Sequence, residues 1–93
     1  MYITMRRYSG TKWSDDAAKK VQADFLPIIR KVKGFKDYYC VDGGHGVLTT
    51  VSVFDDKEGA EESGRKSATW VQENLKSVVP SLPEVTSGTV VAH

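Results

Sequence analysis

The stretch from Phe35 to Phe54 constrains the fold most, because it has the pattern of two β-strands joined by a tight glycine-rich turn. Tyr, Val, Thr and Phe dominate both arms, and these residue types favour a pleated sheet surface. Between the arms lies the segment Asp42–Gly46, and its glycines reach positive φ angles without steric cost. The sequence therefore predicts a central β-hairpin, around which the other elements can be placed.

Before the hairpin, the sequence predicts one strand and one helix. Residues 2–8 alternate as a short strand, with Ile3 and Met5 on one face and Tyr2, Thr4, Arg6 and Tyr8 on the other. Ser14 is a helix N-cap residue type, and two aspartates follow it where the helix dipole favours negative charge. Pro27 lies inside this helix and predicts a kink near residues 23–27. The expected apolar stripe of the helix is Ala18, Val21, Phe25, Ile28, Ile29 and Val32.

After the hairpin, the sequence predicts a second helix and a last strand. Asp55 or Asp56 begins the helix, and Pro80 and Pro83 end it. A strand over residues 85–92 follows, with Gly88 marking a bulge. The expected inward stripe of the helix has small residues in its first half and comprises Ala60, Gly64, Ser67, Ala68, Val71, Leu75 and Val78.

The element order is therefore βαββαβ. With right-handed crossovers, this order gives a four-stranded antiparallel sheet with both helices on one face, the ferredoxin-like arrangement of an α+β fold. Ninety-three residues make one small domain, so we assign residues 1–93 to a single unit.

The strand after the glycine turn carries apolar groups on both faces, whereas two helices cover only one. Leu48, Thr50, Ser52 and Phe54 form the face expected toward the helices. An uncovered Val/Thr face on a small domain predicts association, and a symmetric homodimer is the commonest solution. The predicted dimer interface is Val47, Thr49, Val51 and Val53, joined by Tyr39 or Tyr38 and part of the first strand.

Composition excludes several classes of function. A net charge of +1 gives no field that would gather nucleic acid or an anionic membrane. No apolar run approaches the ~18 residues of a membrane span. Cys40 is the one cysteine, which leaves no disulfide and no cysteine-based metal site, and we expect a cytoplasmic protein.

Four parts of the chain carry a family resemblance. They are the hairpin, the junction VLTTVSVFDDKEGAEES, the KGF after the first helix and the ending LPEVTSGTVVAH. These parts resemble the dimeric α+β-barrel superfamily. Within it, the chain is most similar to the antibiotic-biosynthesis-monooxygenase-like domains. The resemblance implies a dimer packed sheet against sheet, a pocket between the sheet and helices of each subunit, and no cofactor. Some members oxidise polycyclic phenols without metal or flavin, some degrade haem, and many have no assigned reaction.

The family's catalytic residues are not retained. In an ungapped alignment, the strand Asn of the cofactor-free monooxygenases falls on Thr50, their strand-end Trp on Phe54 and their helix Tyr on Ala60. The haem-degrading branch needs a helix His that this chain lacks. The catalytic residues are therefore unknown, and fold similarity alone does not transfer an activity.

Small residues on the second helix face medium-sized ones on the third strand, which predicts either a close contact or a cavity. The hydroxyls there favour the cavity, because buried polar groups need partners. We expect a pocket for a small aromatic or apolar metabolite. Its predicted lining is Met5, Arg7, Phe25, Thr50, Ser52, Phe54, Gly64, Ser67, Trp70 and Asn74.

Five residues need a further interpretation, and one of them, Trp70, also belongs to the predicted lining. Trp70 is expected to flank the core, either on a pocket wall or as a seal at the domain edge. His45 is expected to be a solvated turn residue, and Cys40 a small strand residue. Tyr38 and Tyr39 point to opposite faces, so at most one of them lines the pocket. Two functions stay open: a cofactor-independent oxygenase, or a non-catalytic dimer that binds a small molecule.

Overall fold

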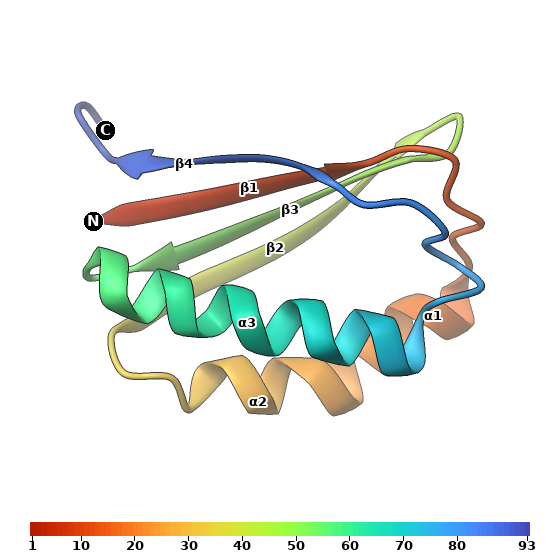
Figure 1. The fold of residues 1–93 in the computed structure, drawn as a ribbon, viewed down its shortest axis with the longest axis horizontal. Coiled ribbons are helices and arrows are strands. Elements are labelled where there is room, and N and C mark those ends of the chain that lie inside the picture. The colour runs from red at the N-terminus through yellow and green to blue at the C-terminus, as the bar shows by residue number, and fades with distance from the viewer.

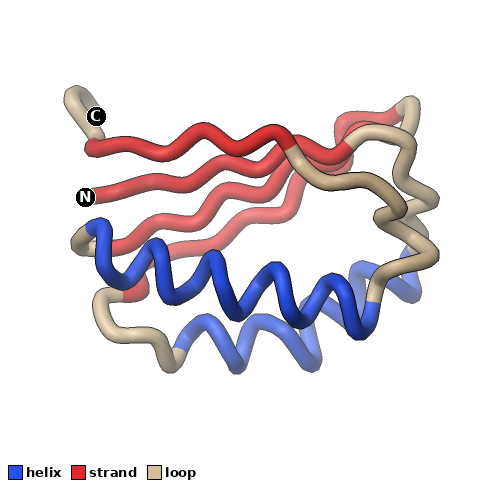
Figure 2. The backbone as a smooth tube through the Cα atoms, in the orientation of Figure 1, coloured by secondary structure: helices blue, strands red, loops and turns tan.

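The computed structural model describes residues 1–93 as two layers, a four-stranded sheet covered on one face by helices (Figures 1 and 2). The predicted α+β ferredoxin-like fold is confirmed. In chain order the elements are β1 (Tyr2–Tyr8), α1 (Asp15–Lys20), η1 (Val21–Phe25), α2 (Leu26–Arg30), β2 (Phe35–Gly44), β3 (Val47–Phe54), α3 (Lys57–Asn74) and β4 (Glu84–Thr89).

The strands run in the order β2-β3-β1-β4, and every neighbouring pair is antiparallel. The predicted hairpin joins β2 to β3 through His45 and Gly46, which both have positive φ, as a two-residue turn of type I′ requires. The pairing of β1 with β4 runs without a register shift, so the bulge expected at Gly88 is wrong. β4 also ends at Thr89, earlier than expected.

The first helix is interrupted where Pro27 predicted an irregularity. A π-helical turn, η1, separates α1 from α2, and the Leu26 N–H donates to the carbonyl of Val21. Pro27 has no N–H to donate, and a widened turn before it accommodates that loss. The widened turn keeps Val21 and Phe25 on the buried face. Ala17, rather than the predicted Ala18, lies there with them.

Helix α3 begins at Asp56, whose side-chain Oδ1 accepts from the Gly59 N–H at 3.0 Å. Its buried face consists of Gly59, Ala60, Ser63, Ser67 and Trp70. The helix is therefore rotated relative to the stripe expected from sequence, in which Gly64, Ala68 and Val71 lay at the centre. Few apolar residues lie between positions 57 and 69, so Trp70 decides which face is buried.

The two faces of β1 are the reverse of those that the predicted pocket required. Thr4 and Tyr8 are buried under the helices, and Met5 is 42% exposed on the opposite side. Placing Met5 and Arg7 in the pocket is therefore wrong. A strand alternates between two faces, but its pattern does not say which face meets the helices when both carry apolar groups.

The sheet face that the helices leave uncovered is called the outer face here. Met5 pairs with Val51 on β3, and Val51 pairs with Tyr39 on β2, so these three side chains form a row across three strands. Tyr39 is 54% exposed and Val41 is 51% exposed. The outer face comprises Ile3, Met5, Arg7, Tyr39, Val41, Val47, Thr49, Val51 and Val53.

The main core lies between the helices and the sheet, toward the end that holds α1 and the C-terminal half of α3. A smaller cluster of Val32, Phe54 and Ala60 fills the other end. None of the helices combines the length and hydropathy that crossing a membrane would require.

Candidate functional site

A cavity of about 30 Å³ lies inside the main core, between the sheet and the helices. Its walls are mostly hydrophobic, and its polar groups come chiefly from the sheet. A cavity of this volume has room for about two water molecules. The lining residues are Arg6, Tyr8, Trp13, Val21, Phe25, Tyr38, Cys40, Leu48, Thr50, Ser67, Trp70, Val71, Leu75 and Val79.

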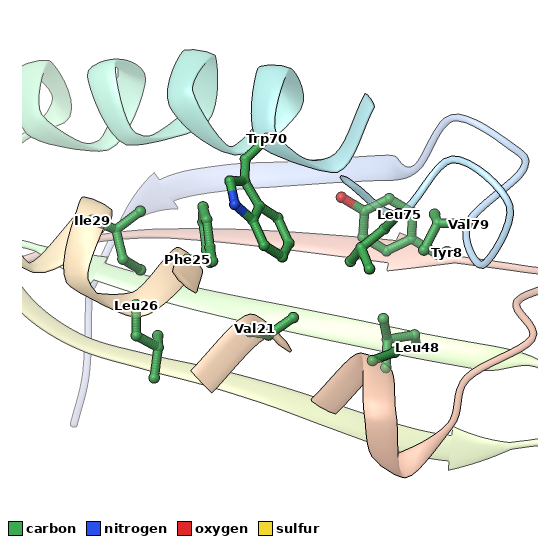
Figure 3. Packing of buried hydrophobic residues seen from close by; sticks show 10 residues of the cluster. Tyr8, Val21, Phe25, Leu26, Ile29, Leu48, Trp70, Leu75 and Val79 are labelled. Carbon is green, nitrogen blue, oxygen red and sulfur yellow. The ribbon is translucent and has the colours of Figure 1, made fainter. Parts of the chain in front are cut away.

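Aromatic rings form the wall of the cavity nearest the helices. The Trp70 indole extends from α3 toward Phe25 on η1 (Figure 3), and their ring centroids lie 5.1 Å apart. Phe25 also meets Tyr38 of β2 edge to face, at 5.6 Å between centroids. Such pairs are stabilising beyond the area they bury, so this wall is a rigid contact surface for another ring. Trp70 is 8% exposed, and the expectation that it only flanks the core is wrong.

The phenols and the thiol that face the cavity are uncharged at neutral pH. Burial raises the pKa of Tyr38 strongly, although the Arg6 charge and a hydrogen bond with Thr50 act in the opposite direction. Burial also raises the pKa of Tyr8, and it raises the pKa of the Cys40 thiol to about 11. These groups therefore keep their protons at neutral pH, and they do not act as bases or nucleophiles there.

The structure brings four of the ten predicted pocket residues to the cavity, namely Phe25, Thr50, Ser67 and Trp70. Ser52 and Phe54 face the helices as expected, but they lie fully buried farther along β3 and do not line the cavity. The Asn74 side-chain amide donates to the backbone carbonyl of Trp70 at 2.9 Å, so it forms a hydrogen bond within the last turn of α3. Gly64, Met5 and Arg7 also lie outside the cavity.

Ten lining residues are absent from the predicted lining, and five of these are not aliphatic: Arg6, Tyr8, Trp13, Tyr38 and Cys40. Four of them are strand residues in two-residue steps, Arg6 with Tyr8 and Tyr38 with Cys40. That spacing placed each pair on one face of its strand, and the register of the hairpin places Cys40 opposite Thr50. The alternation along β2 therefore already placed Tyr38 and Cys40 on one face of the sheet. Trp13, in contrast, lies in a loop whose path no sequence pattern predicts.

Open grooves border the cavity on the protein surface. One, of about 170 Å³, shares Trp13, Val21, Tyr38 and Cys40 with the cavity. A second, of about 230 Å³, shares Arg6, Tyr8, Val71 and Val79 with it. The cavity thus shares part of its lining with two grooves on the protein surface.

A third groove, of about 470 Å³, runs between α3 and the strands β1 and β4, and we call it the α3 groove. It shares only Arg6 with the cavity. Its residues are Tyr2, Thr4, Arg6, Ala60, Glu61, Gly64, Arg65, Ala68 and Ser87. The small residues of α3 thus border an open groove as well as the buried core.

His, Cys, Asp and Glu side chains nowhere gather in groups of three or more that would suit a metal ion. His45 is exposed in the hairpin turn, as the sequence predicted.

No protein-family model matches the chain, and no curated protein matches it significantly by sequence. Solved structures do match it along 99% of its length. One is a protein of unknown function from Nitrosomonas europaea, NE2512, with 16% identity, a TM-score of 0.76 and 90% of its own length covered.

Two similar structures are described as oxygenases. A monooxygenase from the gene ActVA-Orf6 of Streptomyces coelicolor, solved with the ligand nanaomycin D, has 11% identity, a TM-score of 0.76 and 88% of its length covered. SnoaB, a cofactor-independent oxygenase from Streptomyces nogalater, has 11% identity, a TM-score of 0.71 and 94% covered. At these identities the likeness shows the fold. The chain therefore has the α+β ferredoxin-like fold of antibiotic biosynthesis monooxygenase-like proteins, as its sequence resemblance predicts.

Proposed function

We propose that this chain is a monooxygenase-like protein that binds a small aromatic metabolite between its sheet and helices. The observation that carries the proposal is the cavity in the core, which has an aromatic wall of Phe25 and Trp70 and is also lined by Tyr8 and Tyr38. An apolar space with a few convergent polar groups is the usual form of a small-molecule site.

A ring enters this cavity only if side chains move. About 30 Å³ is far below the ~150 Å³ of an engineered protein cavity that binds benzene. Trp13 is half-buried and is one of the residues that border both the cavity and one surface groove, so the proposal requires its indole to move aside. The sequence predicted a pocket sized for a small aromatic molecule, and the cavity is smaller than that, so the proposal requires an open form in which its walls separate.

Oxidation of a phenol suits both the site and its structural neighbours. When a phenol and O₂ give a quinone and water, one oxygen atom becomes the new carbonyl and the other leaves as water. The substrate supplies all four electrons, so the reaction balances without a further reductant. Arg6 places a positive charge at the cavity, which favours an ionised phenol, the form that gives an electron to O₂ most readily.

A second candidate is a binding protein without a reaction. No carboxylate or imidazole lines the cavity, and the pKa values of both its phenols and of its thiol are raised. The chain therefore offers no general base, and only a phenol that is already acidic would lose its proton there.

We also propose that the protein is a homodimer that packs outer face against outer face. The exposed apolar side chains Met5, Tyr39 and Val41 of the outer face support this arrangement, because an apolar surface of this kind favours burial against a second copy. The helices lie on the other face, so each subunit keeps its own cavity.

Calorimetric titration with simple phenols and hydroquinones, combined with an oxygen electrode, tests the function. We expect one ring bound per subunit, with oxygen uptake if the protein is an enzyme and none if it only binds. Ser67→Leu adds apolar atoms to the cavity and should weaken binding at least tenfold if the ring enters there. Lys66→Leu is the matched control on the exposed side of α3 and should leave binding unchanged. Absence of binding by every phenol would contradict the proposal.

A further inference from the structure

Arg6 lies where the cavity meets the open surface. It extends from β1 toward α3, half-buried, and it borders the cavity, the groove beside Tyr8 and the α3 groove. No other residue borders all three spaces. A ligand that occupied both the cavity and the α3 groove would pass beside its guanidinium.

The guanidinium of Arg6 has no acidic partner. The two ion pairs of the structure join Lys36 to Asp55 at 3.1 Å and Lys57 to Glu61 at 3.7 Å. Glu61 is the one acid of the α3 groove, and its carboxylate is directed to Lys57. Because Arg6 pairs with no carboxylate of the protein, its guanidinium is free to bind an anion from a ligand.

Helix α3 leaves room for this cation at Gly64. A Cβ built on Gly64 would lie 2.6 Å from the Nη2 atom of Arg6, closer than real contacts allow. Ala60 and Ala68 lie one turn away on either side, and both border the α3 groove. The small residues that sequence analysis assigned to a pocket for the ring therefore make space for a charged side chain.

The polar groups around Arg6 suit an anion. Ser87 donates to the hydroxyl of Thr4 at 3.3 Å, and both hydroxyls border the α3 groove together with Tyr2. Arg65 adds a second positive charge at the rim, so the charged residues of the groove are two arginines and Glu61. A guanidinium binds a carboxylate through two parallel hydrogen bonds, which is the geometry an exposed fork of N–H donors offers.

We propose that Arg6 binds the carboxylate of the ligand in the α3 groove while the aromatic ring occupies the adjoining cavity. The ligand class is therefore an aromatic carboxylic acid. This inference rests on the proposed function, because it assumes that a ring enters the core.

A pair of matched probes tests it: 4-hydroxyphenylacetate and its neutral amide, 4-hydroxyphenylacetamide, which share the ring and nearly the same shape. Calorimetric titration at about pH 7.5 keeps the carboxylate ionised. We expect the acid to bind at least about tenfold more tightly than the amide, as a hydrogen bond to a charged group implies. The preference should shrink as salt is added.

Three variants assign the preference to a residue. Arg6→Met keeps an apolar stem and should abolish the preference for the acid, with an unchanged or higher Tm because an unpaired charge is removed. Gly64→Ala should weaken the preference for the acid, because the added Cβ displaces the guanidinium at the flexible end of the Arg6 side chain. Arg65→Gln, at the exposed rim, is the control and should retain it.

The outcomes separate the two proposals. If acid and amide bind equally, or if Arg6→Met keeps the preference, the carboxylate site is wrong and the aromatic cavity stands. If neither probe binds, the carboxylate site is wrong, and the proposed function fails with it only if the simple phenols do not bind either. A preference lost in Arg65→Gln but kept in Arg6→Met would place the anion at the rim and overturn the assignment to Arg6.

Discussion

Gly59 fixes how α3 packs on the rest of the fold, and replacing it by alanine should destabilise the protein measurably. A Cβ at this position would lie 2.6 Å from the carbonyl oxygen of Lys33 and 3.1 Å from Cδ1 of Phe54. The first contact involves backbone, so it is relieved only by moving the start of α3 or the loop before β2. Either movement also disturbs the hydrogen bond from Gly59 to Asp56 that caps the helix.

The magnitude follows from two opposing effects. Overpacking of this kind costs about 1–3 kcal/mol, whereas alanine in a helix gains at most about 1 kcal/mol over glycine. A net loss of about 1–2 kcal/mol lowers the Tm of a domain of this size by ~5–15 °C. Thermal unfolding followed by far-UV circular dichroism measures this directly.

Gly88→Ala is the matched control. No heavy atom lies within 4 Å of a Cβ at Gly88, and the backbone there is not left-handed. Alanine restricts the unfolded chain and should raise stability by about 0.4–1 kcal/mol. A Gly59→Ala protein as stable as the parent would refute the close packing of α3 against Lys33, and with it the placement of the α3 groove.

Three further predictions concern the dimer, the buried hydroxyls and the thiol. Val51→Lys places a charge at the centre of the outer face and should yield monomers in sedimentation velocity; a parent protein that is itself monomeric at micromolar concentration would contradict the dimer. Ser63 is 1% exposed and its hydroxyl has no partner, so Ser63→Ala should gain up to about 1 kcal/mol in urea unfolding, and a loss would show that a partner exists. The pKa of Cys40 is raised to about 11, so the folded state holds this proton after the unfolded chain has lost it, and stability should fall as pH rises from about 9 toward 11. Cys40→Ala should flatten that fall, and an unchanged pH profile would contradict the burial of the thiol.

The sequence predicted the fold well because its signals were local and strong. The hairpin combines strand-forming arms with a turn that needs positive φ, and Pro27 falls where the first helix becomes irregular. Both features depend on residues close together in the chain. The face of β3 that meets the helices was also predicted correctly, since Phe54 and Leu48 are its largest residues and both are buried.

The site was predicted only in part, because two decisions depended on tertiary packing. β1 carries apolar residues on both faces, so alternation did not reveal that Arg6 and Tyr8, rather than Met5, lie under the helices. α3 has a weak apolar stripe, and one large side chain, Trp70, sets its rotation. The importance of Arg6 appears only once Gly64 is seen directly above its guanidinium, a contact between residues 58 positions apart in sequence.

The central claim is that a small aromatic molecule binds between the sheet and the helices, and intermolecular nuclear Overhauser effects test it most directly. With 4-hydroxyphenylacetate as the probe, we predict contacts from its ring protons to the rings of Phe25, Tyr38 and Trp70. These three side chains form the aromatic wall of the cavity. Contacts only to Tyr39 and Met5 on the outer face, or none at saturating ligand, would contradict the account.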